Sequence, residues 1–265
     1  MRLLPAAGLA LIAVLLFGSA ALSADCILDR GLQRAVIRVV DGETLVLDDG
    51  SEVRLVGALS PRLLDASADE VEWPPEREAK AELERIALGK SVELGFVGTR
   101  ADRYGRHLAQ VFVIADGRRI WVQEHMVRAG HARAYSLPDN AACLEELVAI
   151  ERNARERGSG LWANAAYQVR PAERTRALLR YRSTFQIVEG RVESVADVRG
   201  QIFLNFGSDW REDFTVRVRP SDRRSMQLDF KAMQGRRVQV RGWIDRRSGP
   251  SIELRHAGQI EVLPD

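Results

Sequence analysis

Apolar and polar positions alternate in short runs over residues 33–56, which is typical of β-strands with one buried face. The run AVIRVV reaches a turn signal at Asp41-Gly42, TLVLDDG leads into a second turn, and SEVRLVG follows. Two further strand-like runs are SVELGFVG and HLAQVFVI. Between the third and fourth runs, residues 74–90 predict a helix, because Pro75 suits its first turn and Gly89 suits its end.

Two more helices are expected after the fifth strand. The segment IWVQEHMVRAGHA predicts a helix that Gly130 ends, and residues 140–157 place four apolar side chains on one helical face, at Leu144, Leu147, Val148 and Ile150. About five strands with helices after the third and the fifth predict a small Greek-key barrel of the OB type, covered by helices.

Strand-like runs return from Phe185 to the end of the chain, separated by turn signals, and residues 226–233 predict one short helix. The segment between the two halves, residues 168–184, carries five arginines and reads as a basic helical linker, either a solvated helix face or a nucleic-acid contact. The predicted class is therefore mainly β with α: a barrel domain over residues 25–167, a linker over 168–184, and a second, smaller OB-like barrel over 185–265.

The first 24 residues have the layout of a secretory signal peptide: Arg2, an apolar run, and then small residues. A retained membrane anchor is the alternative, but the small residues favour cleavage, which leaves no stable anchor. The chain has two cysteines, Cys26 and Cys143, and an even pair in an exported protein predicts a disulfide. We therefore expect a periplasmic or extracellular protein.

Charge changes this picture little. The formal net charge is +2, so the chain as a whole is not a polycation. The basic residues are nearly all arginines, with lysines only at Lys80, Lys90 and Lys231. Arginine suits bidentate phosphate contacts, although the base composition of the genome explains the same bias equally well.

Five segments occur in a telling order: VVDGETLVL, VRLVGALSP, ADRYGRHLAQVFV, GHARAY and ERNARERGSGLW. The ordered set resembles the thermonuclease (staphylococcal nuclease) family from about Gln33 to Ala163. The resemblance implies an OB-type barrel and a calcium-dependent endonuclease that cleaves phosphodiester bonds in DNA or RNA, with single strands as the expected partner. It leaves the C-terminal domain out.

The resemblance assigns roles to four residues. Arg54 and Arg106 match the two phosphate-binding arginines of the family, which stabilise the charge of the phosphodiester under attack. Arg106 follows a glycine in DRYGR, and the turn is expected to bring it close to Arg54. Tyr104 matches a tyrosine that lines the site. Tyr135 lies near the position where the family stacks a base, and a plain packing role is nearly as well supported.

The metal and base positions depart from the family pattern. Glu43 and the backbone carbonyl of Ser60 stand where the family binds calcium, but Leu59 replaces the second calcium-binding aspartate. Arg62 replaces the catalytic glutamate, so it would attract a phosphate and repel a cation. Calcium binding and hydrolysis are thus in question unless a nearby acid substitutes, with candidates at Asp65, Asp69, Glu70, Glu72 and Asp102.

Three functions remain open from the sequence: a nuclease with an atypical site, a phosphate-binding module without hydrolysis, and a cell-envelope interaction protein that contacts no nucleic acid. A second aromatic and basic stretch surrounds Trp210 in the C-terminal half, where acids in the same stretch weaken a nucleic-acid role. Its members are Phe203, Phe206, Arg211, Arg217 and Arg219, with the acids Asp209, Glu212 and Asp213.

Overall fold

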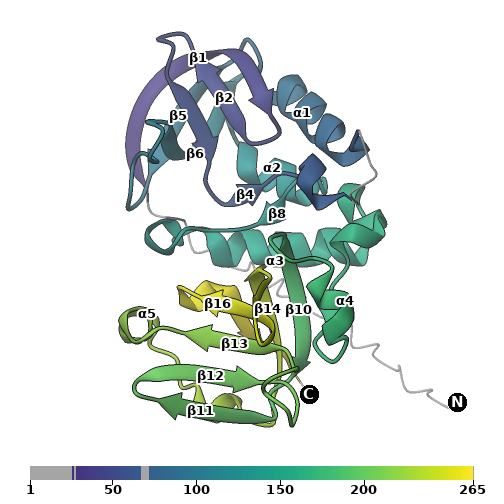
Figure 1. Ribbon diagram of the computed structural model, residues 1–265. Helices are drawn as coiled ribbons and strands as arrows, with labels where there is room; N and C mark the ends of the chain where they lie inside the picture. The colour runs from purple at the N-terminus through teal and green to yellow at the C-terminus, as the bar shows by residue number, and fades with distance from the viewer. Residues whose placement is uncertain (1–25, 27, 67–71, 265) are drawn as a thin grey trace, which may run out of the picture.

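The computed structural model describes residues 26, 28–66 and 72–264, so the expected signal peptide lies outside it. The first half is a sheet in the order β3-β2-β1-β5-β6-β7 that closes through an additional parallel pairing of β3 with β6 (Figure 1). Its strands are β1 Asp29–Asp41, β2 Thr44–Leu47, β3 Glu52–Leu55, β5 Ser91–Phe96, β6 His107–Ala115 and β7 Arg118–Trp121. The predicted five-stranded barrel and the mainly β fold class are confirmed.

Three helices cover this barrel: α1 Pro74–Ala87, α2 Val122–Arg128 and α3 Leu144–Glu156. Alternate positions on the strands and one face of each helix share one core, in which Leu45, Leu83 and Met126 are fully buried. A small sheet of β4 Ala58–Leu59 and β8 Arg133–Ala134 lies beside the helices (Figure 1). The second helix is shorter than expected because residues 118–121 extend the sheet as β7.

The second half repeats the pairing scheme of the first. β12 Gln201–Asn205 pairs antiparallel with β13 Thr215–Val218, β13 pairs parallel with β16 Gly249–Leu254, and the helix α5 Pro220–Met226 follows β13. In the first half the same places belong to β2, β3, β6 and α1. The strands are β10 Phe185–Arg191, β11 Ser194–Val198, β12 Gln201–Asn205, β13 Thr215–Val218, β14 Arg237–Trp243, β15 Asp245–Arg247, β16 Gly249–Leu254 and β17 Ile260–Val262.

Two expectations about the second half are corrected. Residues 168–184 contain only one short helix, α4 Thr175–Leu179, and β9 Arg170–Pro171 pairs with β10. Leu178 is fully buried in the core of the second half, so this segment is part of that unit and not a helical linker. The helix expected at 226–233 lies earlier, in α5, because Pro220 starts it and Gln227 ends it in a left-handed conformation.

The two halves meet through a buried ion pair. Arg241 on β14 donates through Nη1 to Glu151 Oε2 on α3 at 2.8 Å, and Glu151 Oε1 accepts the backbone N–H of Ala134 at 2.7 Å. Glu151 is completely buried and Arg241 is 5% exposed. Arg133 adds a second link by donating through Nη1 to the carbonyl of Phe185 at 2.6 Å. The strand β8 is therefore held by both halves at once.

A disulfide joins Cys26 to Cys143, as the sequence predicts, with 5.2 Å between their Cα atoms. It ties the start of the described chain to the residue before α3. Among residues 26, 28–66 and 72–264, no helix is long and apolar enough to cross a membrane.

The buried pair gives a stability prediction. Glu151→Ala is expected to lower the free energy of unfolding by about 3–5 kcal/mol, because it leaves the Arg241 guanidinium buried without its partner. Urea denaturation followed by tryptophan fluorescence measures this change. The matched control is Lys80→Ala, which removes an exposed pair with Glu84 on α1 and is expected to cost no more than about 0.5 kcal/mol. Equal midpoints for the two variants would show that the Arg241–Glu151 pair does not hold the halves together.

Candidate functional site

A polar pocket of about 440 Å³ opens at one end of the first barrel. The parallel pairing of β3 with β6 places Arg54 opposite Leu108, two residues after Arg106, so both arginines reach the same pocket. Gly105 turns the chain before β6 with a φ of +82°, a conformation that few other residues adopt. The lining residues are Asp41, Arg54, Ser60, Arg62, Glu76, Arg103, Tyr104 and Arg106.

Arg106 is held by the turn that precedes it. Its Nε donates to Asp102 Oδ2 at 2.8 Å, and its Nη2 lies 2.7 Å from the same oxygen. Burial alone raises the pKa of Asp102, but the hydrogen bonds from Arg106 and from the N–H groups of Tyr104 and Arg106 outweigh it, so the pKa lies below its usual value. The carboxylate therefore stays charged and fixes the guanidinium at neutral pH. Asp102 is thus a positioning residue for Arg106 and not a free metal ligand.

Glu43 does not line the pocket itself but contacts two of the arginines that do. Its side chain is 1% exposed, and its Oε1 forms an ion pair with Arg54 Nη2 at 3.2 Å and accepts a hydrogen bond from Arg62 Nη2. The backbone N–H of Ser60 donates to its other oxygen at 3.0 Å. The turn at Gly42 holds Glu43 in place, because the N–H of Glu43 donates to Asp41 Oδ1 at 2.9 Å. Both carboxylate oxygens thus already have strong donors.

These residues do not fit a calcium ion. Calcium takes about 6–8 oxygen ligands, whereas Glu43 is bound by two guanidiniums, and Leu59 is buried in β4 with no oxygen on its side chain. Arg62 places its charge on the carboxylate that calcium would need. Within the described ranges, no group of three or more histidine, cysteine, aspartate or glutamate side chains is arranged to hold a metal ion.

The acids considered as substitutes lie elsewhere or are engaged. Asp65 accepts from Arg133 Nη2 at 2.8 Å and from the Tyr167 hydroxyl at 3.1 Å, in a buried network. Glu72 is exposed and pairs with Arg77 at 3.2 Å. Asp69 and Glu70 fall outside the described residues.

The two tyrosines have different surroundings. Tyr104 is 69% exposed at the pocket rim, and the guanidiniums of Arg103 and Arg106 lie 4.8 and 5.6 Å from its ring centre. Tyr135 does not line this pocket. It packs edge-on against Phe185 at 5.8 Å and Trp243 at 5.2 Å between ring centres, where burial raises the pKa of its hydroxyl. Its place is the junction of the two halves.

Three lining residues were not singled out from the sequence: Asp41, Glu76 and Arg103. Asp41 opens the turn Asp41-Gly42, and Arg103 lies inside the DRYGR segment, so both stand beside residues that the motifs mark. Glu76 comes from the first turn of α1 and accepts the backbone N–H of Leu63 at 3.1 Å. That contact joins segments 13 residues apart, and no local pattern indicates it.

Comparison with known proteins covers the same region. Residues 52–164 match the family model described as staphylococcal nuclease homologue. This region is similar to the staphylococcal nuclease family, and we call it the nuclease domain after that similarity. A thermonuclease of Staphylococcus hyicus is 29% identical over 132 residues, which are 49% of this chain and 75% of that protein. Two uncharacterised proteins, one of Methanocaldococcus jannaschii and one of Bacillus anthracis, are each 29% identical over 48% of this chain. The matched part covers 70% of the first protein and 59% of the second.

The nuclease domain thus has the barrel of its family, and its family is typically calcium-dependent, while the donor set at Glu43 does not suit that ion. What the site can do chemically is different. Arg54, Arg62 and Arg106 present guanidinium groups to one cavity, and a guanidinium matches the geometry of a phosphate. An exposed aromatic ring, Tyr104, lies beside them.

Because both oxygens of Glu43 are already engaged, we can predict how the nuclease domain responds to calcium. Calcium at millimolar concentration is expected to leave the melting temperature of the natural chain unchanged. The variant Leu59→Asp, Arg62→Glu supplies two carboxylates and removes the competing cation. If calcium is present at ten times its Kd, this variant gains about 1.4 kcal/mol, which raises its melting temperature by about 3–6 °C.

Differential scanning calorimetry with calcium and with chelator makes the comparison. The control is Arg62→Ala, which removes the cation but adds no ligand, and which should respond no more than the natural chain. A calcium-dependent rise in the natural chain would contradict the assignment of Glu43 to the two arginines.

Proposed function

We propose that the nuclease domain binds nucleic acid through its phosphates and does not hydrolyse it with calcium. The observation that carries this proposal is the contact of Arg62 with Glu43. Arg62 stands at the position of the family's catalytic base, and it engages the one carboxylate that remains at the expected calcium position. The arginines that line the pocket have the geometry to bind a phosphate.

Arg54 and Arg106 supply the grip. A guanidinium carries five N–H donors, and Asp102 engages Nε and Nη2 of Arg106, so its Nη1 is directed to other acceptors. Arg54 and Arg62 share the negative charge of Glu43, and the carboxylates of Asp41 and Glu76 line the same pocket. A phosphate that enters between Arg54 and Arg106 therefore gains charge-assisted hydrogen bonds without removing either arginine from its carboxylate.

Single strands suit the site better than duplexes. Tyr104 is exposed next to the arginines, and an aromatic ring offers a base a surface for stacking that contributes about 1–3 kcal/mol per base. Bases in a duplex are already stacked on each other. The proposed ligand is therefore a single-stranded segment of DNA or RNA.

The place of action that we propose is outside the cytoplasm. The layout of residues 1–24 is that of a signal peptide, and a disulfide between Cys26 and Cys143 suits an oxidising compartment. The nucleic acid bound there would be extracellular or periplasmic.

A phosphodiesterase with a rebuilt site is the second candidate. The observation in its favour is that Asp41 and Glu76 line the same pocket as Arg54 and Arg106. Two carboxylates together with the Ser60 carbonyl would give a divalent ion a different set of oxygens from that of the family. Hydrolysis that needs Asp41 and Glu76 would support this candidate.

Binding of a labelled single strand tests the proposal. Arg54→Ala and Arg106→Ala are each expected to weaken binding about tenfold or more, because each removes a hydrogen-bonded charge contact. Each should also reduce the slope of log affinity against log salt concentration by about 0.7, the value for one phosphate contact on a single strand. Fluorescence anisotropy at several salt concentrations gives both quantities.

The matched control is Arg128→Ala, which removes an exposed arginine of α2 that pairs with Glu124. It should leave the affinity and the salt slope as they are. Incubation of the same strand with calcium, with magnesium and with chelator completes the test. Metal-dependent cleavage that disappears in Arg54→Ala would replace the binding proposal with the phosphodiesterase.

A further inference from the structure

The outer face of the sheet in the second half differs from its inner face in a regular way. Along β12, Ile202 and Leu204 point into the core, whereas Gln201, Phe203 and Asn205 line a cavity of about 540 Å³. Along β13, Val216 and Val218 are in the core, whereas Thr215 and Arg217 line the cavity. This alternation leaves one face of the sheet without a covering layer in the described structure.

Arg217 on this face has the same place in the second half as Arg54 has in the first. Both are the third residue of a four-residue strand, and both follow a buried valine. Each strand pairs antiparallel with the strand before it and parallel with a later strand, which is β6 for β3 and β16 for β13. Arg54 contacts Glu43, and Arg217 lies 3.8 Å from Glu253. The phosphate-gripping position of the first barrel thus recurs in the second.

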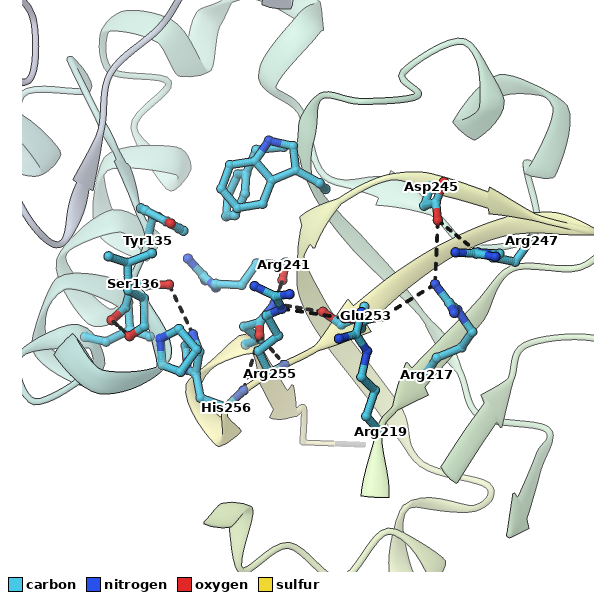
Figure 2. A pocket seen from close by; sticks show the side chains of 16 residues that line it. Tyr135, Ser136, Arg217, Arg219, Arg241, Asp245, Arg247, Glu253, Arg255 and His256 are labelled. Carbon is cyan, nitrogen blue, oxygen red and sulfur yellow. Dashed lines mark hydrogen bonds and ion pairs between the residues drawn. The ribbon is translucent and has the colours of Figure 1, made fainter. Parts of the chain in front are cut away.

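Arg217 and three neighbouring arginines form a cluster that shares two carboxylates (Figure 2). Glu253 contacts Arg217, Arg219 and Arg255, and Asp245 contacts Arg217 and Arg247. The cluster therefore carries an excess positive charge. Burial lowers the pKa of Arg217, and its Nε has no hydrogen-bond partner in the described structure. An anion bound at the cluster would supply the missing negative charge and an acceptor.

Exposed indole rings lie on either side of the cluster. Trp210 is 55% exposed, lines the same cavity as Phe203, and has the Arg211 guanidinium 4.5 Å from its ring centre. Trp243 is 45% exposed and lines a second cavity of about 340 Å³ at the junction of the halves. Arg217 and Arg247 line both cavities, which makes the two cavities one continuous surface.

We propose that this surface, formed by Phe203, Trp210, Arg217, Trp243 and Arg247, is a second binding site for single-stranded nucleic acid. The arginines contact successive phosphates, and the aromatic rings stack with bases that a single strand leaves free. A duplex offers no free base faces, and an anionic lipid headgroup has no planar base that could stack on the aromatic rings. The comparison of Arg217 with Arg54 rests on the proposed function, whereas the charge and the aromatic rings are independent of it.

The position of Tyr135 connects this surface with the pocket of the nuclease domain. Tyr135 lines the junction cavity together with Arg255, and its backbone N–H donates to the carbonyl of Gly57, three residues after Arg54, at 3.1 Å. The positive charges of Arg54 and Arg255 both act to lower the pKa of its hydroxyl, although burial dominates and the pKa is raised. A strand that contacts both sites would have to be long enough to bridge this junction.

Two strand lengths separate the two sites experimentally. An OB-type face covers about 4–16 nucleotides, so labelled single strands of about 8 and about 24 nucleotides would occupy one site and both sites. The double variant Trp210→Ala, Arg247→Ala changes two exposed side chains and is expected to retain the melting temperature. It should weaken binding of the full chain to the long strand about tenfold or more, and it should reduce the quenching of tryptophan fluorescence by the strand.

Arg224→Ala on α5 is the matched control, since Arg224 is exposed and lines neither cavity. If only Arg54→Ala and Arg106→Ala weaken binding, the second site is refuted and the proposed function stands. If only the Trp210, Arg247 variant weakens it, the second site stands and the proposed function falls. Equal binding of the strand by all variants would overturn the second site. So would a double variant that binds the strand as the natural chain does and loses only its binding to anionic vesicles or to a phosphopeptide.

Discussion

The buried ion pair between Arg241 and Glu151 is the interaction on which the arrangement of the two halves depends. Glu151 belongs to α3, a helix that covers the first barrel. Arg241 belongs to β14, a central strand of the four-stranded sheet in the second half. Because Glu151 also accepts the N–H of Ala134, the pair fixes the strand β8 and the residue that follows it. Tyr135 thereby comes to lie against Phe185 and Trp243, and the junction cavity acquires its shape.

A single carboxylate decides the chemistry of the first pocket. In a calcium site, Glu43 would need lone pairs free for the ion, but here Arg54 and Arg62 contact its Oε1 and the N–H of Ser60 donates to its Oε2. The long side chain of Arg62 reaches Glu43, and Leu59 offers no oxygen ligand, so the side chains at this place do not suit calcium.

Sequence patterns predict the parts of this molecule that depend on short-range order. The first barrel, its helices and the nearness of Arg54 to Arg106 follow from strand alternation and from a motif around one turn, and the disulfide follows from a lone pair of cysteines. The contact of Arg62 with Glu43 joins residues 19 apart, and that of Arg241 with Glu151 joins residues 90 apart. Such side-chain pairings depend on how strands and helices pack, and no local periodicity encodes them. The segment 168–184 was misjudged for the same reason, since its burial depends on β10.

The recurrence of one pairing scheme in both halves gives these separate observations a common explanation. Both β3 and β13 pair on one side with the strand before them and on the other side with a later strand, β6 or β16. Each has one face in the core and one face open. An arginine at its third position must therefore extend from the open face, and a glutamate on a neighbouring segment holds it there, as Glu43 does for Arg54 and Glu253 does for Arg217. The two arginines have equivalent places in the two pairing schemes, and Tyr135 lines the cavity at the junction where Arg241 contacts Glu151. Under the proposed function, these two positions would both bind phosphate.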